Sequence, residues 1–416
     1  MYWKTLLGLL ALYGLQHVPA PYWEDVYPGP NSHLFMFAIN SPTIFLLSMG
    51  LSAFLTSYLF IEILSLFVPP LKAARLGGRP GRGQLNRIAN RTGVVLLFIQ
   101  AFVTMSNFRN LNPWEAEVSA IAYMVCGLSL IGGTLIAVAL CRWISRQGLI
   151  EGYCGFLFVG MLVDQFQWLR AIPEPINLIP VIIIAILILG ATSRLMTVRT
   201  KSANYDLPMF PQTFEVIHFA AFAVQLPVTL AALNQWDFDV TAWGQPIQLS
   251  AILLLSLTFP FLFSSAKRVR AGLAGKELSA NFYEQYSTAW RGQIAVGTVV
   301  LLSCAGFTGY FQETKNAHLP FLELIPIAAI ALDIYRSNMF WRGRSRADVT
   351  GIDLDNLHAV NHLLPILRQK EVPHFVMGYH FRALVYWMVP FAKMAVFVPT
   401  EHRSTVDDAI RDLQQQ

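Results

Sequence analysis

Glu62, Glu215 and His218 are ionisable side chains inside otherwise apolar stretches of the sequence. An ionisable group in such a stretch is costly unless it is paired or has a function, so these residues are the first candidates for chemistry. Glu215 and His218 are three residues apart and share one face of a helix. The same spacing occurs in one half of a di-iron site. No other apolar stretch contains a second such pair, so we expect no metal and no cofactor.

Two functions and one structural role remain open for these residues. Hydrogen bonds among Glu62, Glu215 and His218, joined by Thr56 and Gln100, would form a polar latch between helices. The same groups would form a proton path in a secondary transporter. Alternatively, they are polar side chains that are satisfied near helix ends and have no role.

The composition indicates a membrane protein. Of the 416 residues, 55% are hydrophobic and only 13% are charged, about half of the roughly 25% that soluble domains contain. This excludes an ordinary soluble enzyme and an intrinsically disordered chain. The four cysteines have no CxxC spacing, and the sequence has no glycine-rich phosphate loop or GxSxG motif. We therefore expect no enzyme, and the positive net charge does not indicate nucleic acid.

Ten apolar stretches predict ten membrane-spanning helices, although several are shorter than the roughly 20 residues that cross a bilayer. They lie near 4–17, 44–68, 92–106, 118–141, 149–163, 173–197, 212–233, 247–265, 292–311 and 319–340. Lys and Arg gather in every second loop, whereas the alternate loops carry only Arg109, Arg170 and Lys315. Because basic loops stay in the cytoplasm, both termini are predicted to be cytoplasmic.

The basic loops are the predicted contacts for anionic lipids and for docking partners in the cytoplasm. The loop 69–91 is rich in glycine and arginine, which predicts a flexible docking loop. The candidate docking residues in this loop and in the loop 266–291 are Arg75, Arg79, Arg82, Lys267, Arg268, Arg270 and Lys276.

Five segments, in order along the chain, resemble the SecY family of protein-conducting channels. Residues 12–21, LYGLQHVPAP, are similar to the exit of that family's first span, and residues 48–64, SMGLSAFLTSYLFIEIL, to its second span. Residues 146–160, RQGLIEGYCGFLFVG, are similar to the beginning of its fifth span. The last two pieces are Leu207 and Pro208 followed by Val216 and Ile217, before the seventh helix, and Asp333 in the tenth.

The resemblance covers about 1–340 and implies an all-α membrane protein of two inverted five-helix halves, about 1–165 and 170–346. It implies that polypeptides are moved or inserted across a prokaryotic cytoplasmic membrane through a pore that a ring of apolar side chains closes. It places the polar latch at a lateral gate, and it makes the segment 30–48 a plug; the alternative is a loop on the membrane surface. The ring residues matched by position are Leu55, Leu59, Tyr153, Leu157, Ala220 and Ile327, with Pro326 as an alternative to Ile327.

The resemblance also implies partners. These are a SecE-like small subunit, a SecG-like subunit, and a ribosome or a SecA-type motor. The ribosome or motor would supply the energy, since no motif in this sequence is expected to bind nucleotide. The segment 275–291 lacks the family's Arg-Pro-Gly element, and Met209 and Phe210 stand where a Lys is expected, which indicates a divergent member. Two alternatives stay open: a non-conducting paralogue that acts as a dedicated insertase or scaffold, and a proton-coupled secondary transporter with inverted repeats.

After Arg346 the composition changes, and 347–416 is predicted to be a cytoplasmic α-β-β-α module. Leu357, Val360 and Leu364 recur at helical spacing, which predicts an amphipathic helix. The module weakly resembles small ferredoxin-like domains, which implies a regulatory role. Its expected elements are a helix over 354–370, strands over 372–377 and 394–398, and a helix over 403–413.

Overall fold

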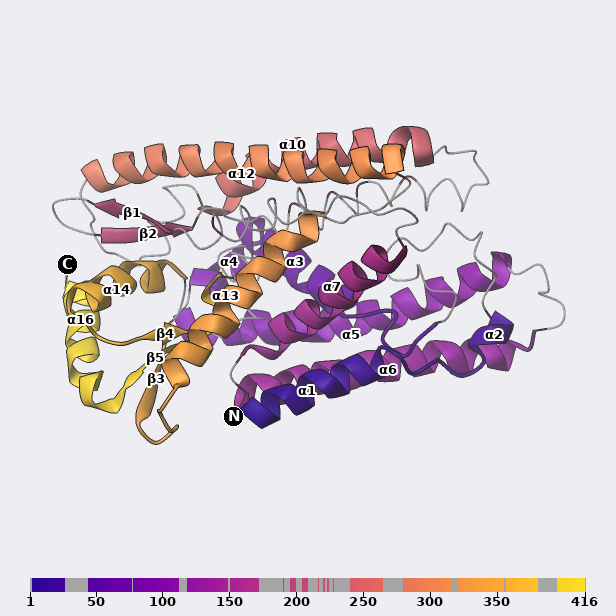
Figure 1. The fold of residues 1–416 in the computed structure, drawn as a ribbon, viewed down its shortest axis with the longest axis horizontal. Coiled ribbons are helices and arrows are strands. Elements are labelled where there is room, and N and C mark those ends of the chain that lie inside the picture. The colour runs from indigo at the N-terminus through magenta and orange to yellow at the C-terminus, as the bar shows by residue number, and fades with distance from the viewer. Residues whose placement is uncertain are drawn as a thin grey trace. The chain divides into compact units, whose positions relative to one another are not determined.

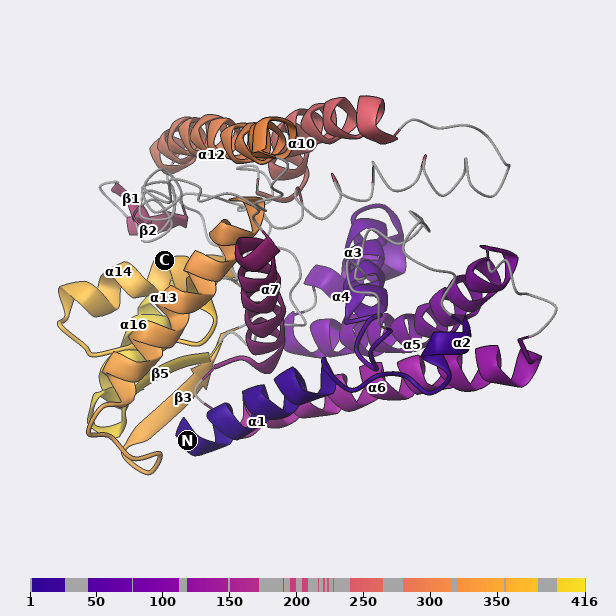
Figure 2. The same cartoon turned by 45° about the vertical axis from the view of Figure 1, so that its right-hand side comes forward.

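The computed structural model describes residues 2–26, 44–76, 78–111, 118–148, 150–171, 190, 195–199, 204–208, 216, 220, 223, 227, 240–264, 280–315, 321–354, 357–380 and 395–415. The chain divides into two compact units. The first comprises Met1–Val159 and Val228–Trp236, and the second comprises Gly160–Pro227 and Asp237–Gln416. Figures 1 and 2 label the elements of both.

The first unit is a bundle of antiparallel helices. Helix α1 lies along α6 in both views (Figures 1 and 2), and Lys4 Nζ donates a hydrogen bond of 2.8 Å to Gln147 at the far end of α6. Helix α3 packs on α5, where Ser57 Oγ donates to the Ala89 carbonyl at 2.6 Å. The helices are α1 Tyr2–Leu15, α2 Trp23–Val26, α3 Ser52–Phe67, α4 Pro69–Leu76, α5 Gly78–Leu111, α6 Ala120–Gln147 and the start of α7 Gly152–Ala171.

The glycine- and arginine-rich segment 69–91 is helical apart from the junction between α4 and α5, so the prediction of a flexible loop was wrong. Pro80 falls in the first turn of α5, where a residue without an N–H loses no helical hydrogen bond. Gly81 lets the two helices touch, because a β-carbon there would lie 1.9 Å from the carbonyl oxygen of Ala74. Tertiary contact therefore overrides the local signal for a loop.

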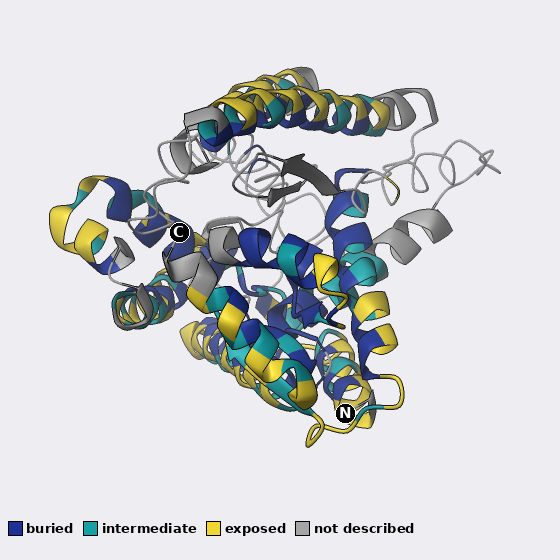
Figure 3. Cartoon of the chain, turned by 90° about the vertical axis from the view of Figure 1, so that its left-hand side faces the viewer, coloured by how far each residue is buried: buried dark blue, intermediate teal, exposed yellow. Residues whose placement is uncertain are grey.

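The second unit contains long helices of the same kind. Helices α10, Val240–Ser264, and α12, Ala280–Lys315, pack together, and Thr298 Oγ1 donates a buried hydrogen bond of 3.0 Å to Ser256 Oγ. Buried residues recur about every four positions along α12, and exposed residues occupy its other side (Figure 3). A 3-10 turn, Phe321–Glu323, leads into α13, Leu324–Trp341.

Two small sheets complete the second unit. Strands β1, Leu195–Arg199, and β2, Asn204–Pro208, form an antiparallel hairpin that contacts α14. The C-terminal sheet has the order β3-β5-β4 with antiparallel pairs. Its elements are β3 Val349–Asp353, α14 Leu357–Gln369, β4 Phe375–Val376, β5 Ala395–Pro399, the 3-10 turn Thr400–His402 and α16 Arg403–Gln415.

The C-terminal segment has its own apolar core. Val360, Leu363 and Leu367 from α14 pack against Val396 on β5 and Val406 on α16, and all five are fully buried. The sequence prediction contained no counterpart of β3, so the order of the described elements is β-α-β-β-α instead of α-β-β-α. Strand β3 pairs with β5, which lies more than 40 residues away along the chain.

Three described helices are long and apolar enough to cross a membrane: Gly83–Ser106, Ala120–Gln147 and Phe282–Gly309. Shorter apolar helices cover Trp3–Leu15, Ser52–Phe67, Gly152–Leu162 and Pro246–Pro260. The predicted spans near 173–197 and 212–233 lie mostly outside the described residues. The count of ten spans stays a prediction.

Candidate functional site

The ring residues predicted for the first unit lie on buried or half-buried faces of α3 and α7. Leu55 and Leu59 are 7% and 3% exposed, and Thr56 and Phe60 next to them are exposed. Since an α-helix has 3.6 residues per turn, Leu55 and Leu59 share one face of α3, and that face points into the unit. On α7, Tyr153 is buried and Leu157 is half-buried.

A polar network that the sequence reasoning missed joins four helices beside these leucines. Arg142 on α6 donates a hydrogen bond of 3.1 Å to the side-chain oxygen of Asn90 on α5. Arg142 also hydrogen-bonds the Tyr153 hydroxyl of α7, and Asn90 hydrogen-bonds Tyr58 of α3. Tyr58 lies between Leu55 and Leu59 in sequence, so the network fixes the rotation of the face that bears them.

The remaining ring residues belong to the second unit. Ala220 is fully buried, Pro326 is buried and Ile327 is half-buried. Pro326 and Ile327 lie in the first turn of α13.

Residues 44–51 form irregular backbone inside the first unit. The Ala20 N–H donates to the Ile44 carbonyl at 2.7 Å, and the Leu46 N–H donates to the Val18 carbonyl at 2.9 Å. A β-carbon on Gly133 would lie 2.2 Å from the Leu46 carbonyl oxygen. Gly133 is at the middle of the 28-residue helix α6, so this backbone lies at the depth of the helix centre. Residues 27–43, which include most of the predicted plug, lie outside the described residues.

The described polar residues predicted for the gate lie at different levels of α3. Gln100 of α5 and Ser52, in the first turn of α3, exchange hydrogen bonds of 3.0 and 3.2 Å. Glu62 is 5% exposed and lies ten residues further along α3, about 15 Å at 1.5 Å per residue. Thr56 is on the exposed side. Glu215 and His218 lie outside the described residues.

Most basic side chains of the first unit lie at one end of its helices, whereas Arg109 lies at the other end of α5. Lys4 begins α1, Arg142 and Arg146 end α6, and Arg87 and Arg91 lie in the first half of the antiparallel helix α5. The acidic helix α2 lies near the other end (Figures 1 and 2). This segregation of charge within one bundle is the pattern that the positive-inside rule requires of a membrane-spanning unit.

The predicted docking residues are in part described. Arg75 lies in α4, and Arg79 and Arg82 lie in the first turns of α5. Lys267, Arg268, Arg270 and Lys276 lie outside the described residues. Among the residues that the structure describes, no three His, Cys, Asp or Glu side chains gather as metal ligands.

Asp333 of α13 binds the C-terminal segment. Its Oδ1 atom accepts a hydrogen bond of 2.9 Å from the backbone N–H of His380 and lies 2.8 Å from Nδ1 of the same residue. The exposed fractions of the two side chains are 7% and 2%. This buried pair joins the predicted tenth helix to the segment that follows it.

Comparison with known proteins gives one consistent result. A SecY family model matches residues 45–281. The protein translocase subunit SecY of Bacillus subtilis (strain 168) is 23% identical over 310 residues, which are 62% of this chain and 71% of that protein. SecY of Buchnera aphidicola subsp. Baizongia pistaciae is 26% identical over 128 residues, which are 30% of this chain and 29% of that protein.

Solved structures show the same likeness in fold. A SecY structure described in terms of a plug domain that stabilises the closed translocation channel has a TM-score of 0.51 and 12% identity. The channel of a canine ribosome-channel complex from the endoplasmic reticulum has the same TM-score of 0.51 and 12% identity. Each covers 81% of this chain and 91% of the solved chain.

Proposed function

The chain belongs to the SecY family, and from this we propose that it is the channel subunit of a protein translocase that moves or inserts polypeptides across a prokaryotic cytoplasmic membrane. The observation that carries the proposal is the position of the irregular segment 44–51, which packs against the middle of α6. Backbone outside helices is tolerated at membrane depth only where protein buries it or where it lines a cavity. A helix bundle that only anchors a protein does not need such a segment.

The proposed seal is an apolar ring. Leu55, Leu59, Tyr153 and Leu157 would supply its first half, and Ala220 with Ile327 would supply its second half. A narrow apolar constriction excludes ions because water leaves it, yet its side chains move aside for an extended polypeptide. The burial of Leu55 and Leu59 on one face of α3 supports this role. Residues 44–51 would lead into a plug beneath the ring.

The proposed gate uses hydrogen bonds that an arriving apolar segment replaces. The bond between Gln100 and Ser52 holds α5 to α3, which would form one side of the seam. Hydrogen bonds among Glu62, Glu215 and His218 would hold the seam shut at the level of Glu62. We also propose ten spans with both termini in the cytoplasm, a SecE-like partner helix, a SecG-like subunit, and docking of a ribosome or a SecA-type motor.

A crosslinking experiment tests the channel directly. A photoreactive residue at Leu59 is expected to crosslink to a preprotein stalled during translocation, because this buried face would line the pore. The same residue at Phe60, which is 54% exposed on the adjacent side of α3, is the matched control and is expected to crosslink to lipid. Equal preprotein adducts at both positions would remove the argument for a pore face.

A second measurement separates the channel from a proton-coupled carrier. Glu62→Gln replaces a buried carboxyl group with an uncharged amide of the same size. For a channel we expect unchanged proton flux in liposomes and altered insertion of signal segments. Loss of a substrate-dependent proton flux would instead establish the carrier.

One observation favours a second candidate, a non-conducting paralogue that acts as a scaffold or dedicated insertase. The C-terminal segment 347–416, which we propose to be a regulatory cytoplasmic module, contacts the hairpin β1–β2 through α14. That hairpin belongs to a basic loop predicted to face the cytoplasm, so the contact would cover part of a docking surface. Co-purification from native membranes distinguishes the two: a ribosome or motor supports translocation, and membrane proteins alone support the scaffold.

A further inference from the structure

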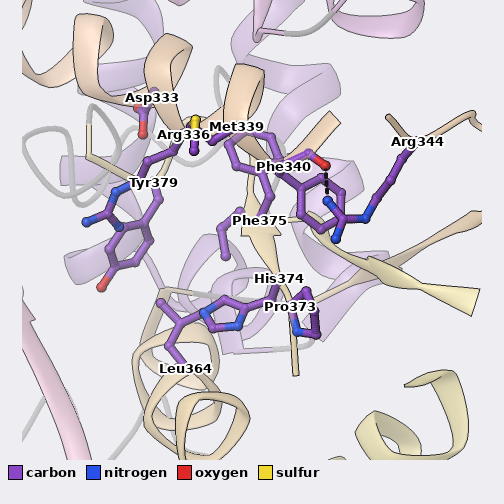
Figure 4. Close-up of a pocket in the computed structure, with 11 residues that line it drawn as sticks. Asp333, Arg336, Met339, Phe340, Arg344, Leu364, Pro373, His374, Phe375 and Tyr379 are labelled. Atoms are coloured by element: carbon purple, nitrogen blue, oxygen red, sulfur yellow. Dashed lines mark hydrogen bonds between the residues drawn. The ribbon is translucent and has the colours of Figure 1, made fainter. Parts of the chain in front are cut away.

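A cavity of about 400 Å³ opens within the second unit between the end of α13, strand β4 and α14 (Figure 4). Arg336, Phe340 and Arg344 border it from α13 and the turn that follows, and Leu364, His374 and Phe375 border it from the C-terminal segment. The rings of Phe340 and Phe375 are stacked with centroids 5.9 Å apart, which gives the cavity an apolar wall.

The charged groups available to a ligand in this cavity are cationic. Arg336 and Phe340 are four residues apart on α13 and share one of its faces, and Arg344 borders the cavity from the turn after the helix. The Arg344 guanidinium lies 5.0 Å from the centre of the Phe340 ring and donates a hydrogen bond to the Phe340 carbonyl (Figure 4). The one carboxylate on the wall, Asp333, is already bound to His380.

His374 is the imidazole on the wall of the cavity. Burial lowers the pKa of its imidazole, and the guanidinium groups of Arg368 and Arg336 lower this pKa further, although a hydrogen bond to the Val372 carbonyl opposes them. Burial is the largest cause of this shift, and the positive charge of the cavity comes from Arg336 and Arg344 on its wall. An anion in the cavity would balance this charge.

The position of the cavity indicates where the anion comes from. Tyr335 and Met339, on α13 beside the arginines, are 61% and 51% exposed. Tyr rings are enriched at the membrane interface, and in the ten-span topology that we propose α13 is the tenth span and ends in the cytoplasm. Basic pockets at the cytoplasmic ends of spans bind the phosphates of anionic lipids. We propose that this cavity binds the phosphate of an anionic phospholipid headgroup, with the acyl chains along α13.

Lipid binding to the full-length chain in nonionic detergent tests this site, which does not depend on polypeptide conduction. Native mass spectrometry with phosphatidylglycerol is expected to show at least about tenfold weaker binding for Arg336→Gln/Arg344→Gln, because charged hydrogen bonds to the phosphate are lost. The matched control is Arg342→Gln/Arg346→Gln, which removes the same charge from exposed residues outside the cavity. That control is expected to bind within about twofold of the parent.

Further arms identify the source of the phosphate. Phosphatidylcholine is expected to bind far more weakly than phosphatidylglycerol, and inorganic phosphate is expected not to displace the lipid. Arg336→Lys/Arg344→Lys, which keeps both charges, should retain binding and shows that the site survives substitution. Equal effects of the two Gln pairs, equal binding of both lipids, or saturable binding of inorganic phosphate with no preference for lipid would each overturn the proposal. With phosphatidylglycerol bound, the NMR titration of His374 should shift to a higher pKa.

Discussion

The substitution Gly133→Ala is expected to loosen the segment 44–51 and to let ions leak through the resting protein, whereas Gly132→Ala is expected to do neither. A β-carbon at Gly133 would lie 2.2 Å from the Leu46 carbonyl oxygen and 2.8 Å from its carbon. These are backbone atoms, so no side-chain rotation relieves the clash. Gly132 has no neighbouring atom within 4 Å of the same position.

Alanine substitutions at the adjacent glycines Gly132 and Gly133 are expected to change the stability in opposite directions. Alanine favours a helix over glycine by about 0.5–1 kcal/mol, so Gly132→Ala is expected to raise the thermal stability of α6 slightly. Overpacking at Gly133 is expected to cost about 1–3 kcal/mol in spite of that gain. Thermal unfolding of the purified protein in detergent measures both effects.

Ion leak tests the functional part of this prediction. If the segment 44–51 leads into the seal of the channel, a destabilisation of about 1.4 kcal/mol of the closed arrangement raises the open population about tenfold. Potassium efflux from liposomes that contain each variant measures this population. A loss of stability at Gly133→Ala with no leak would show that the segment is structural and would refute its role in the seal.

Asp333→Ala is expected to release the C-terminal segment from α13, with a loss of about 3–5 kcal/mol in the free energy of unfolding. The substitution removes a buried acceptor and leaves the backbone N–H and the ring Nδ1 of His380 without it, and each buried polar group that loses its partner costs about 1–3 kcal/mol. Both hydrogen bonds of His380 to Asp333 Oδ1 would be lost. Hydrogen exchange at residues 375–380 should accelerate, because β4 and the turn after it depend on this contact.

Two further variants make the Asp333 result specific. His380→Ala should cost less than Asp333→Ala, because alanine keeps the backbone N–H that donates to Asp333 Oδ1, and the double variant should cost clearly less than the sum, because the pair is coupled. Glu401→Ala is the matched control: its contact with His402 is 3.6 Å long and exposed, so its loss should cost at most about 1 kcal/mol. Additive losses at Asp333 and His380 would contradict a direct pair.

The family assignment came from the sequence and was confirmed by the SecY family model over residues 45–281. The family could be predicted because each span and its flanking turn form a continuous stretch of sequence. Segments such as 48–64 and 146–160 therefore show the resemblance without information about which helices pack against them. The prediction that Leu55 and Leu59 are ring residues on one face of α3 came from the same resemblance together with helical periodicity. Leu55 and Leu59 are four residues apart, which alone places them on one face.

The polar contacts between helices could not be predicted from the sequence in this way. Arg142 and Asn90 are 52 residues apart, and Asp333 and His380 are 47 apart. Neither pair has a spacing that marks it in the sequence. The faces of α5 and α6 must first be brought together before their polar residues become partners, so only the folded unit identifies Tyr58, Asn90 and Arg142 as supports for Tyr153.

The sequence by itself determined the membrane class, the family and the distribution of basic residues, because hydropathy and charge bias are sums over neighbouring residues and need no third dimension. The tertiary structure decided the helical state of 69–91, the strand β3 and the position of residues 44–51 against α6. In each case the deciding interaction joins the backbones of two separate elements: Gly81 meets Ala74 across a helix junction, β3 pairs with β5, and Gly133 admits the Leu46 carbonyl. Local propensity is weak against such contacts, since each glycine acts only through the neighbour that folding brings to it.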